Sequence, residues 1–412
     1  MPDAPSAAET VLPARVPPFA PFRHRNFRLL WTGLIVSNTG SWMQFVALGY
    51  LVDRLTQSPL YLGILAATQA VPRIIFALLG GAMADRIDRR RLLFWTNLFL
   101  MGTATLLAVL TVTDRVQIWH VFVIAAVNAL AQSFDMPARH SLVPALVEER
   151  EVLSAISLNS VAFNGAGIFG PSIAGAVIAA IGEGGCFVVN AFSYLGVLSA
   201  LGFMVLPRRE SVGGVRLTED LREGLQLLRQ YSQLILFLGS VLALSFFGRP
   251  YVRMMPTFAR EVLHVGATSL GFLQSAPGVG TILSVLLVGR LSAARGKGML
   301  LGGAMLLYGV FVAAFGTLRS FPFALLLLVA MGTMQAMAMA SANALVQLTT
   351  PPHARGRVMG FYSMVAFGGF ALGSLPVGAV GDAIGVGTAL SAGGVILVFI
   401  ALALLPRLRR YE

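Results

Sequence analysis

Twelve apolar stretches, each long enough to cross a lipid bilayer, run through this sequence of 412 residues. The hydrocarbon core of a bilayer is about 30 Å thick, and a helix rising about 1.5 Å per residue crosses it in about 20 residues. Runs of this length are typical of membrane helices, which satisfy all their backbone groups internally. We therefore predict an all-α membrane protein with twelve transmembrane helices. The runs are Leu29–Val52, Leu55–Ala84, Leu92–Thr113, Val116–Phe134, Val152–Gly182, Gly184–Leu206, Ser232–Ala259, Val262–Leu291, Met299–Leu318, Phe321–Val346, Val358–Gly381 and Ile384–Leu405.

The composition indicates the same environment. Apolar residues make up 56% of the chain and charged residues only 12%, against roughly 25% charged residues in soluble domains. The mean hydropathy is +0.78. A water-soluble domain could not bury this much apolar surface, so lipid is the predicted solvent.

The basic residues are unevenly distributed between alternate loops. The chain has 30 Lys and Arg against 18 Asp and Glu. Most of the basic residues lie on the side that carries both ends of the chain, whereas the opposite loops hold Arg54, Arg115, Arg260 and Arg319. The positive-inside rule therefore predicts that both termini are cytoplasmic. Because the arginines are dispersed and lack interleaved stacking aromatics, nucleic-acid binding is not predicted.

The two halves of the chain are related by an internal repeat. The second run aligns with the eighth, pairing Gly63 with Gly271, and the fifth aligns with the eleventh, pairing Gly175 with Gly378. Six runs per half give both copies the same orientation, which is the parallel-repeat arrangement of one class of transporters. We predict two six-helix bundles. The predicted divisions are a cytoplasmic tail at 1–26, a bundle at 27–206, a linker at 207–231, a bundle at 232–406 and a tail at 407–412.

The linker contains leucines at helical spacing, Leu217, Leu221, Leu225 and Leu228, with charged residues on the other faces. This pattern predicts an amphipathic helix lying on the inner leaflet. A solvated connector is the alternative.

A dense group of charges follows the second run, in the sequence Gly81-Ala-Met-Ala-Asp85-Arg86-Ile-Asp88-Arg89-Arg90-Arg91. It resembles the signature between the second and third helices of the major facilitator superfamily, with glycine first, aspartate fifth and a basic pair at the ninth and tenth positions. Met83 and Asp88 depart from that signature. An acid at a helix end beside several arginines can hold neighbouring helices together. The alternative is that the arginines only set the topology.

The resemblance implies a cytoplasmic gate in this loop. It implies that Asp85 faces the start of the eleventh helix, where the helix dipole favours an anion. It also implies that Arg89 reaches an acid near the inner end of the fourth helix, where Asp135 is the acid present. The gate and charge network implied in this way comprises Gly81, Asp85, Arg86, Arg89, Arg90 and Asp135.

Seven segments spread over nearly the whole chain resemble, more narrowly, the secretion-effector branch of this superfamily, which includes the enterobactin exporter. The resemblance implies a secondary active transporter of the bacterial inner membrane. It would export a small amphiphilic compound, drug-like or siderophore-like, by alternating access and proton antiport. The branch often has an arginine three positions before Gly170, where this chain has Gly167. The segments are Phe27-Arg-Leu-Leu-Trp31, Ser37-Asn38-Thr-Gly40, Asp85-Arg86, Phe134-Asp135-Met-Pro137-Ala-Arg139, Gly170-Pro171, Phe247-Gly-Arg249-Pro250-Tyr251 and Pro277-Gly278.

The fifth run resembles the glycine-proline signature of facilitator antiporters. Proline removes a backbone donor and bends the helix, and glycines give a small contact surface on which two bundles can rock. This pattern favours export over import, and ordinary close packing of helices is the alternative. The predicted hinge residues are Gly165, Gly170, Pro171 and Gly175.

Few ionisable residues lie inside the runs. Each costs about 2.5–3.5 kcal/mol at a helix centre on insertion scales, so each is a functional candidate. Arg73 lies in the middle of the second run, and Arg249 and Arg253 lie four residues apart on one face of the seventh. Arg249 and Arg253 either form a cationic wall of a cavity or reach toward the outer surface. The cavity or coupling candidates are Arg73, Asp135, Arg139, Arg249 and Arg253.

Proton coupling requires a group whose proton affinity changes between inward-facing and outward-facing states. The first run offers no acid near its middle, since Asp53 lies at its outer end, and Asp382 lies at the outer end of the eleventh run. Asp135 is therefore the predicted coupling residue. Coupling to protons itself follows mainly from the resemblance.

Other functions stay open at this point. Uptake or flipping of a lysolipid needs the same fold, and a membrane-embedded enzyme or a scaffold belongs to a different class. The chain has no phosphate-binding loop and no Gly-x-Ser-x-Gly nucleophile motif, and Cys186 is its single cysteine. We predict no enzyme, no cofactor and no metal; the expected partners are a small-molecule substrate, the lipid bilayer and the proton, for a monomer. The scattered histidines, which form no helical metal pair, are His24, His120, His140, His264 and His353.

Overall fold

The computed structural model describes residues 17–84, 88–204 and 231–411. The surroundings of the side chains at 77–84, 288–295 and 353 are outside that description. The amphipathic helix predicted in the linker, and Asp85 and Arg86 of the predicted gate, also lie outside the described residues. Gly81 lies in the last turns of a long helix.

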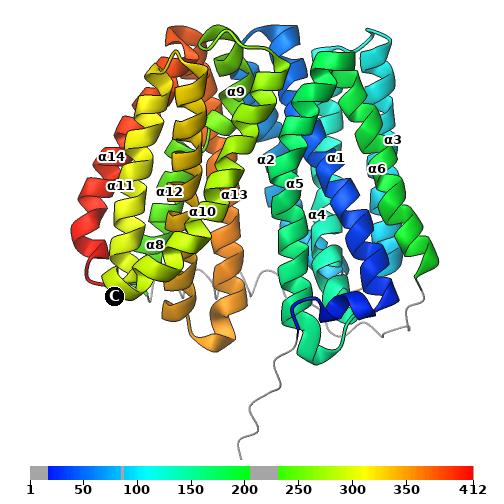
Figure 1. Ribbon diagram of the computed structural model, residues 1–412, viewed down its shortest axis with the longest axis horizontal. Coiled ribbons are helices and arrows are strands. Elements are labelled where there is room, and N and C mark those ends of the chain that lie inside the picture. Colours follow the sequence, from blue (N-terminus) through cyan, green and yellow to red (C-terminus); the bar gives the residue numbers. More distant parts are fainter. Residues whose placement is uncertain (1–16, 85–87, 205–230, 412) are drawn as a thin grey trace, which may run out of the picture.

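Six long helices form the first half of the chain (Figure 1). Single 3-10 turns, Ala20–Arg23 and Glu149–Glu151, precede the first and the fifth of them. Asp88 caps the third helix, because its carboxylate accepts a hydrogen bond of 2.9 Å from the backbone N–H of Arg91. The helices are α1 (Arg25–Thr56), α2 (Pro59–Ala84), α3 (Arg89–Val112), α4 (Ile118–Ala145), α5 (Val152–Ile181) and α6 (Glu183–Phe203).

The second half follows the same scheme, except that its first crossing is broken. A π-helical segment, Leu244–Gly248, separates the two parts of the predicted Ser232–Ala259 helix. Pro250, which lacks a backbone N–H, begins the second part. The elements are α8 (Ser232–Ala243), α9 (Tyr251–Glu261), α10 (Ala267–Arg295), α11 (Lys297–Thr317), α12 (Phe321–Thr349), a 3-10 turn (Pro352–Ala354), α13 (Arg355–Ile384) and α14 (Val386–Leu408).

The predicted membrane architecture is confirmed. Eleven helical segments in the described part of the chain are long and apolar enough to cross a membrane. α1 has 32 residues and is not one of them, because Asn38, Gln44 and several small polar residues lower its hydropathy. With α1, the described residues contain the twelve predicted crossings, and no strand occurs among them.

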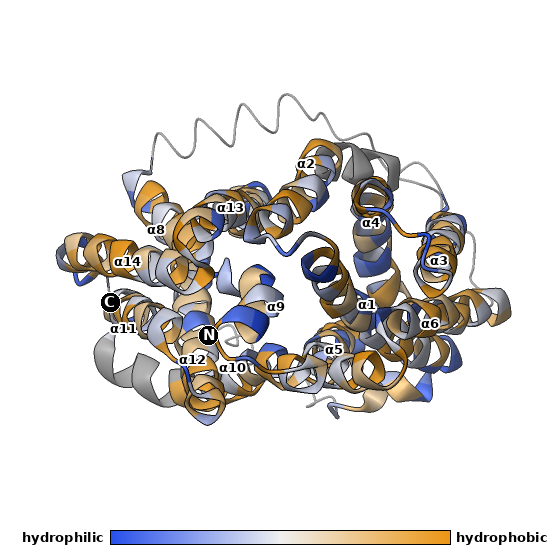
Figure 2. Cartoon of the chain, turned by 90° about the horizontal axis from the view of Figure 1, so that it is seen from above, coloured by the Kyte–Doolittle hydropathy of each residue, from blue (hydrophilic) through white to orange (hydrophobic). Residues whose placement is uncertain are grey.

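The helices pack as two bundles that meet along two helix pairs. Within the first bundle α1 contacts α5 and α6, and α3 contacts α4 and α6; within the second, α11 contacts α12 and α14, and α10 contacts α12. Between the bundles α2 packs against α13 and α5 against α10, as Figure 2 shows from above. These two contacts are equivalent under the internal repeat.

The first contact depends on glycines at both helices. A Cβ atom at Gly63 of α2 would lie 2.7 Å from the carbonyl oxygen of Ser374 on α13, and a Cβ at Gly378 would lie 2.5 Å from the carbonyl oxygen of Pro59. Side chains at these positions would push the helices apart, so glycine is required for this close approach.

The second contact reproduces this geometry with the repeat-related residues. A Cβ at Gly271 of α10 would lie 2.6 Å from the carbonyl oxygen of Pro171, and a Cβ at Gly175 of α5 would lie 2.6 Å from that of Ala267. The internal repeat predicted from paired glycines is therefore confirmed at the level of individual helix contacts.

The two ends of the molecule differ in how the bundles are joined. The described chain begins and ends at the same end, the lower one in Figure 1, which we call the terminal end; the opposite one is the distal end. One buried apolar cluster extends over both bundles, and its members from the first bundle include Val52, Leu62 and Ile178, near the distal end. A separate cluster around Phe27 and Leu201 is confined to the first bundle at the terminal end.

Candidate functional site

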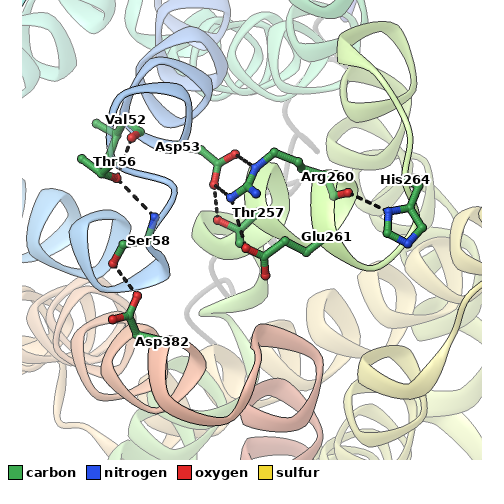
Figure 3. Close-up of polar contacts among 9 residues, drawn as sticks. All are labelled: Val52, Asp53, Thr56, Ser58, Thr257, Arg260, Glu261, His264 and Asp382. Carbon is green, nitrogen blue, oxygen red and sulfur yellow. Dashed lines mark hydrogen bonds and ion pairs between the residues drawn. The ribbon is translucent and has the colours of Figure 1, made fainter.

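The distal ends of α1 and α9 are joined by an ion pair between the bundles. Asp53 lies in the last turns of α1, and its side chain is buried. Arg260 of α9 donates to it twice, from Nε to Oδ2 at 2.7 Å and from Nη2 to Oδ1 at 3.0 Å (Figure 3). The hydroxyl of Thr257 donates to Oδ1 at 2.5 Å. We call Asp53, Thr257 and Arg260 the distal latch, because charge-assisted bidentate pairs of this kind are strong and directional.

A second polar contact lies beside the distal latch. The hydroxyl of Ser58, just before α2, donates to Oδ1 of Asp382 in the last turn of α13 at 2.5 Å (Figure 3). It joins the same two bundles at the α2–α13 contact. The sequence had placed Asp53 and Asp382 at the outer ends of their runs, but it gave no indication of their partners.

Arg253, nearly two turns before Arg260 on α9, extends from the second bundle into the first. Only 3% of the residue's surface is exposed. Its Nη2 donates to Oε1 of Gln69 on α2 at 2.6 Å, and its Cζ lies 4.3 Å from the ring centroid of Phe45 on α1. Its Nε and Nη1 are buried and have no hydrogen-bond partner among the described residues. Of the two orientations left open by the sequence, the structure shows the inward one.

Two more arginines lie inside the crossings. Arg249 lies four residues before Arg253, with its Cζ 5.1 Å from the ring centroid of Phe370 on α13 and its Nε buried without a partner. Arg73 on α2 is exposed and donates from Nη2 to Oε1 of Gln132 on α4 at 2.5 Å. It lies four residues, about one helical turn, after Gln69, which Arg253 contacts. We call Arg73, Arg249 and Arg253 the arginine cluster. Across the described ranges, no carboxylate forms an ion pair with any of them.

Asp135 forms a buried network within the first bundle. Its Oδ2 accepts from Nη2 of Arg139, four residues later on α4, at 2.7 Å. Its Oδ1 accepts from Nδ2 of Asn97 at 2.7 Å and from the hydroxyl of Thr96 at 3.2 Å, both on α3. Nη1 of Arg139 also donates to Oδ1 of Asn38 on α1 at 3.3 Å. Asp135 and Arg139 thus connect α1, α3 and α4.

The sequence model of the transmembrane secretion effector family matches residues 16–412. The chain belongs to this family of major facilitator transporters. The family resemblance found in the sequence motifs is confirmed, and both the family and the fold are those of transporters rather than enzymes.

Relatives of this transporter cover nearly its whole length. It is 27% identical over 385 residues to the uncharacterized MFS-type transporter YfiS of Bacillus subtilis (strain 168), with 89% of each chain covered. It is 25% identical over 397 residues to the multidrug efflux pump Tap of Mycolicibacterium fortuitum, covering 93% of this chain and 96% of Tap. The enterobactin exporter EntS of Shigella boydii is 21% identical over 399 residues, with 94% of each chain covered.

A solved structure confirms the fold. A bacterial homologue of the human lysosomal transporter Spinster, in an inward-facing and unoccupied conformation, superposes with a TM-score of 0.75. The match covers 94% of this transporter and 97% of that chain at 14% identity. At this identity the comparison shows the shared architecture of two six-helix bundles and nothing about the substrate.

The loop after α2 connects helices of the first bundle in this transporter. Nη1 of Arg89 donates to the carbonyl of Ser141 on α4 at 3.1 Å, and Nη2 of Arg90 donates to the carbonyl of Gly202 on α6 at 3.1 Å. The implied pairing of Arg89 with Asp135 is therefore wrong. Arg139 lies one turn from Asp135 on the same helix and reaches it first, whereas Arg89 contacts α4 nearer to the terminal end.

The glycine-proline segment of α5 faces two neighbours. A Cβ at Gly170 would lie 2.7 Å from Cβ of Trp42 on α1, whereas one at Gly165 would meet no heavy atom within 4 Å. Gly175 and Pro171 form the contact with α10 described above, and Gly167 lies against the indole of Trp42. The segment is therefore a contact surface on α5, and its action as a hinge remains a prediction.

Proposed function

We propose that this transporter exports a small amphiphilic compound by alternating access, driven by proton antiport. The observation that carries the proposal is the unequal joining of the two bundles. At the distal end the latch and the Ser58–Asp382 contact cross between bundles. Toward the terminal end, the polar side-chain contacts found among the described residues stay within one bundle, such as Asp135–Arg139 and His24–Glu151.

This arrangement supports a state that is closed at the distal end and open at the terminal end. α5 and α10 meet near the distal end and diverge toward the terminal end (Figure 1). The basic loops and both ends of the chain lie at the terminal end, so the positive-inside rule orients it toward the cytoplasm. An exporter would collect its substrate from the cytoplasm in such a state.

The relatives support export as the direction. Tap is named a multidrug efflux pump and EntS an enterobactin exporter, and both share nearly the full length of this chain. The glycine-proline segment of α5 agrees with that direction, since it was similar to the signature of facilitator antiporters.

Asp135 is the proposed proton-coupling residue. Protonation of its carboxylate would remove the charge that holds Arg139, and Arg139 in turn contacts Asn38 on α1. Since α1 also carries Asp53 of the distal latch, a change at Asp135 acts on the helix that closes the distal end. In proton antiport the substrate and the proton are not bound at the same time, so protonation of Asp135 would accompany release of the substrate at the distal end.

The test is an efflux screen in a bacterium depleted of its own drug pumps. Accumulation of ethidium, of a macrolide and of a catecholate siderophore is measured with the wild type, with Asp135→Asn and with Asp114→Asn. Asp114 is an exposed acid in a distal loop with a positive φ of 52°, which asparagine also adopts, so it controls for the loss of one charge.

We expect the wild type and Asp114→Asn to lower the accumulation of at least one compound in a manner that an uncoupler abolishes. Asp135→Asn should lose the dependence of efflux on the proton gradient. If the wild type leaves the accumulation of every compound unchanged, export of such compounds is wrong. If Asp135→Asn keeps its full pH dependence, the assignment of Asp135 is wrong.

A further inference from the structure

Arg253 lacks the negative charge that its buried position requires. A cation inside a membrane protein is normally paired with a carboxylate or exposed to water, because desolvation of an unpaired charge is costly. Arg253 is 3% exposed, and its partners among the described residues are the neutral amide of Gln69 and the ring of Phe45. Arg73, which is exposed, donates to the neutral amide of Gln132. None of these partner groups carries a negative charge.

Arg253 also has N–H groups that are not used in hydrogen bonds to the described residues. A guanidinium carries five N–H groups in a planar fork that matches an oxyanion. In Arg253 the Nε and Nη1 groups are buried, and nothing in the described part of the chain accepts a hydrogen bond from them. Buried donors without acceptors destabilise a protein, so a site that keeps them open gains most from a ligand that brings acceptor oxygens.

Arg73 and Arg249 add two further positive charges near Arg253. Arg73 belongs to the first bundle and lies about one helical turn after Gln69, which accepts from Arg253 of the second bundle, so two like charges lie on either side of the contact between the bundles and repel each other. Arg249, four residues before Arg253, lies over Phe370 and also has a buried Nε without a partner. An anion between these groups would satisfy the donors and cancel the repulsion at once.

We propose that the arginine cluster binds the oxyanion group of an amphiphilic substrate, with Arg253 and Arg73 as its main partners and Arg249 as support. The ligand is a carboxylate, sulfonate or phosphate ester attached to an apolar body. The rings of Phe45 and Phe370, which flank the guanidinium groups, suit such a body. The inference rests on the proposed function, since it names the substrate class of that transporter.

The site also connects substrate binding to conformation. Arg73 belongs to the bundle of α2 and Arg253 to that of α9, so a bound anion bridges the two bundles. It would stabilise the state in which the distal end is closed, in which Arg253 contacts Gln69 and Phe45. Opening of the distal end would separate the two cations and weaken the site, which favours release on that side.

Binding can be tested without transport. The full-length protein is placed in nanodiscs of zwitterionic phosphatidylcholine and titrated with pyrenebutyrate, pyrenebutanol and pyrenemethylamine, which differ mainly in the charge of the head group. Binding is followed by energy transfer from the protein's tryptophans to pyrene, with empty nanodiscs as the partition control. Arg253→Gln and Arg73→Gln are compared with Arg319→Gln, which removes the same charge from an exposed distal loop.

We expect the wild type and Arg319→Gln to bind the carboxylate about tenfold more tightly than the alcohol. Arg253→Gln and Arg73→Gln should lose most of this preference, and Arg253→Lys should keep part of it. Equal affinity of the wild type for carboxylate and alcohol would overturn the proposal without any variant. A full preference for the carboxylate in both glutamine variants would also overturn it.

Two further arms identify the source of the anion and separate this inference from the proposed function. Displacement of pyrenebutyrate by lysophosphatidylglycerol, but not by naphthoate, would assign the site to a lipid head group, and the reverse to a soluble substrate. If the transporter exports ethidium but binds pyrenebutyrate no more tightly than pyrenebutanol, export stands and the anion site is refuted. Anion binding without efflux of any compound would support the site and refute export.

Discussion

The distal and terminal ends of this transporter use the same chemical pair, aspartate with arginine, for different purposes. At the distal end Asp53 and Arg260 belong to different bundles. In the Asp135 network, Asp135 and Arg139 are one turn apart on a single helix. In the proposed alternating access, rocking of the bundles would break the first pair and could leave the second intact. The location of a pair, rather than its strength, therefore decides whether it opposes the opening of the distal end.

A second comparison lies within the distal end itself. Arg54, the neighbour of Asp53, pairs with Glu183 at the start of α6 at 2.7 Å. Both carboxylates are buried, but Arg54 and Glu183 belong to the same bundle. The adjacent residues 53 and 54 thus form one pair that crosses between bundles and one that does not. Substitution of each pair therefore tests how much an ion pair between the bundles, rather than within one bundle, stabilises the closed distal end.

The largest effect is expected where backbone meets backbone between the bundles. In Gly175→Val the added side chain would have to displace α10, because even a Cβ would lie 2.6 Å from the carbonyl oxygen of Ala267. Overpacking of this kind destabilises a structure by about 1–3 kcal/mol. Only the state with a closed distal end is destabilised here, because only that state brings α5 and α10 this close together. The distance between spin labels at exposed Arg115 and Arg319, one in each bundle at the distal end, should increase in most molecules.

The control for this change is Gly165→Val on the same helix. Its Cβ would meet no heavy atom within 4 Å, so the label distance should stay at its wild-type value. The hinge interpretation of the fifth-run glycines would be contradicted for Gly175 if both variants gave the same distance distribution.

The architecture could be predicted from the sequence because a lipid bilayer restricts which segments can cross it. Every crossing needs about 20 apolar residues, and the repeat was visible in glycines that the two inter-bundle contacts require. Gly182 and Gly385, at repeat-related turns, both adopt positive φ angles, 78° and 91°. Such positions constrain the residue type strongly, so the repeat could be recognised there despite the apolar composition.

The break in the seventh crossing could not be predicted with the same certainty. Pro250 was visible, but Pro72 and Pro171 lie inside helices that continue past them, because neighbouring helices can satisfy the freed backbone groups. What distinguishes the seventh crossing is the π-helical segment Leu244–Gly248 before Pro250. There Gly248 packs directly against the ring of Tyr308 on α11, a contact that no local pattern encodes.

The distal latch was missed for a related reason. The sequence placed Asp53 and Arg260 on the same side of the membrane, but pairing depends on which helices of the two bundles are neighbours. The assignment of Arg89 to Asp135 failed in the same way. The resemblance implied Arg89 as the partner of Asp135, whereas the spacing of four residues on α4 brings Arg139 to this carboxylate.

An intermediate effect is expected from Asp53→Asn. The asparagine keeps the shape but removes the charge that holds Arg260 and Thr257. Because Arg260 is partly exposed, with 40% of its side-chain surface accessible, the loss should be about 1–2 kcal/mol rather than the value for a fully buried pair. The population with an open distal end should rise roughly tenfold in the same spin-label measurement.

Glu183→Gln is the matched control for Asp53→Asn. It removes the charge of a buried carboxylate at the same end, but Arg54 and Glu183 move together in one bundle. We expect its thermal stability to fall while the ratio of open to closed distal ends stays unchanged. An equal change of that ratio in the two variants would show that the distal latch has no special role.

The smallest effect is expected from Ser58→Ala. The variant loses one hydrogen bond to Asp382, at an exposed position where water can replace the hydroxyl. We expect a shift of about 0.5 kcal/mol toward the open distal end. In the double variant Ser58→Ala, Asp53→Asn, the two contacts lie on different helices, so the spin-label populations should reflect the sum of the two shifts. A double variant that opens much more than this sum would show that the latch and the Ser58–Asp382 contact act as one cooperative unit.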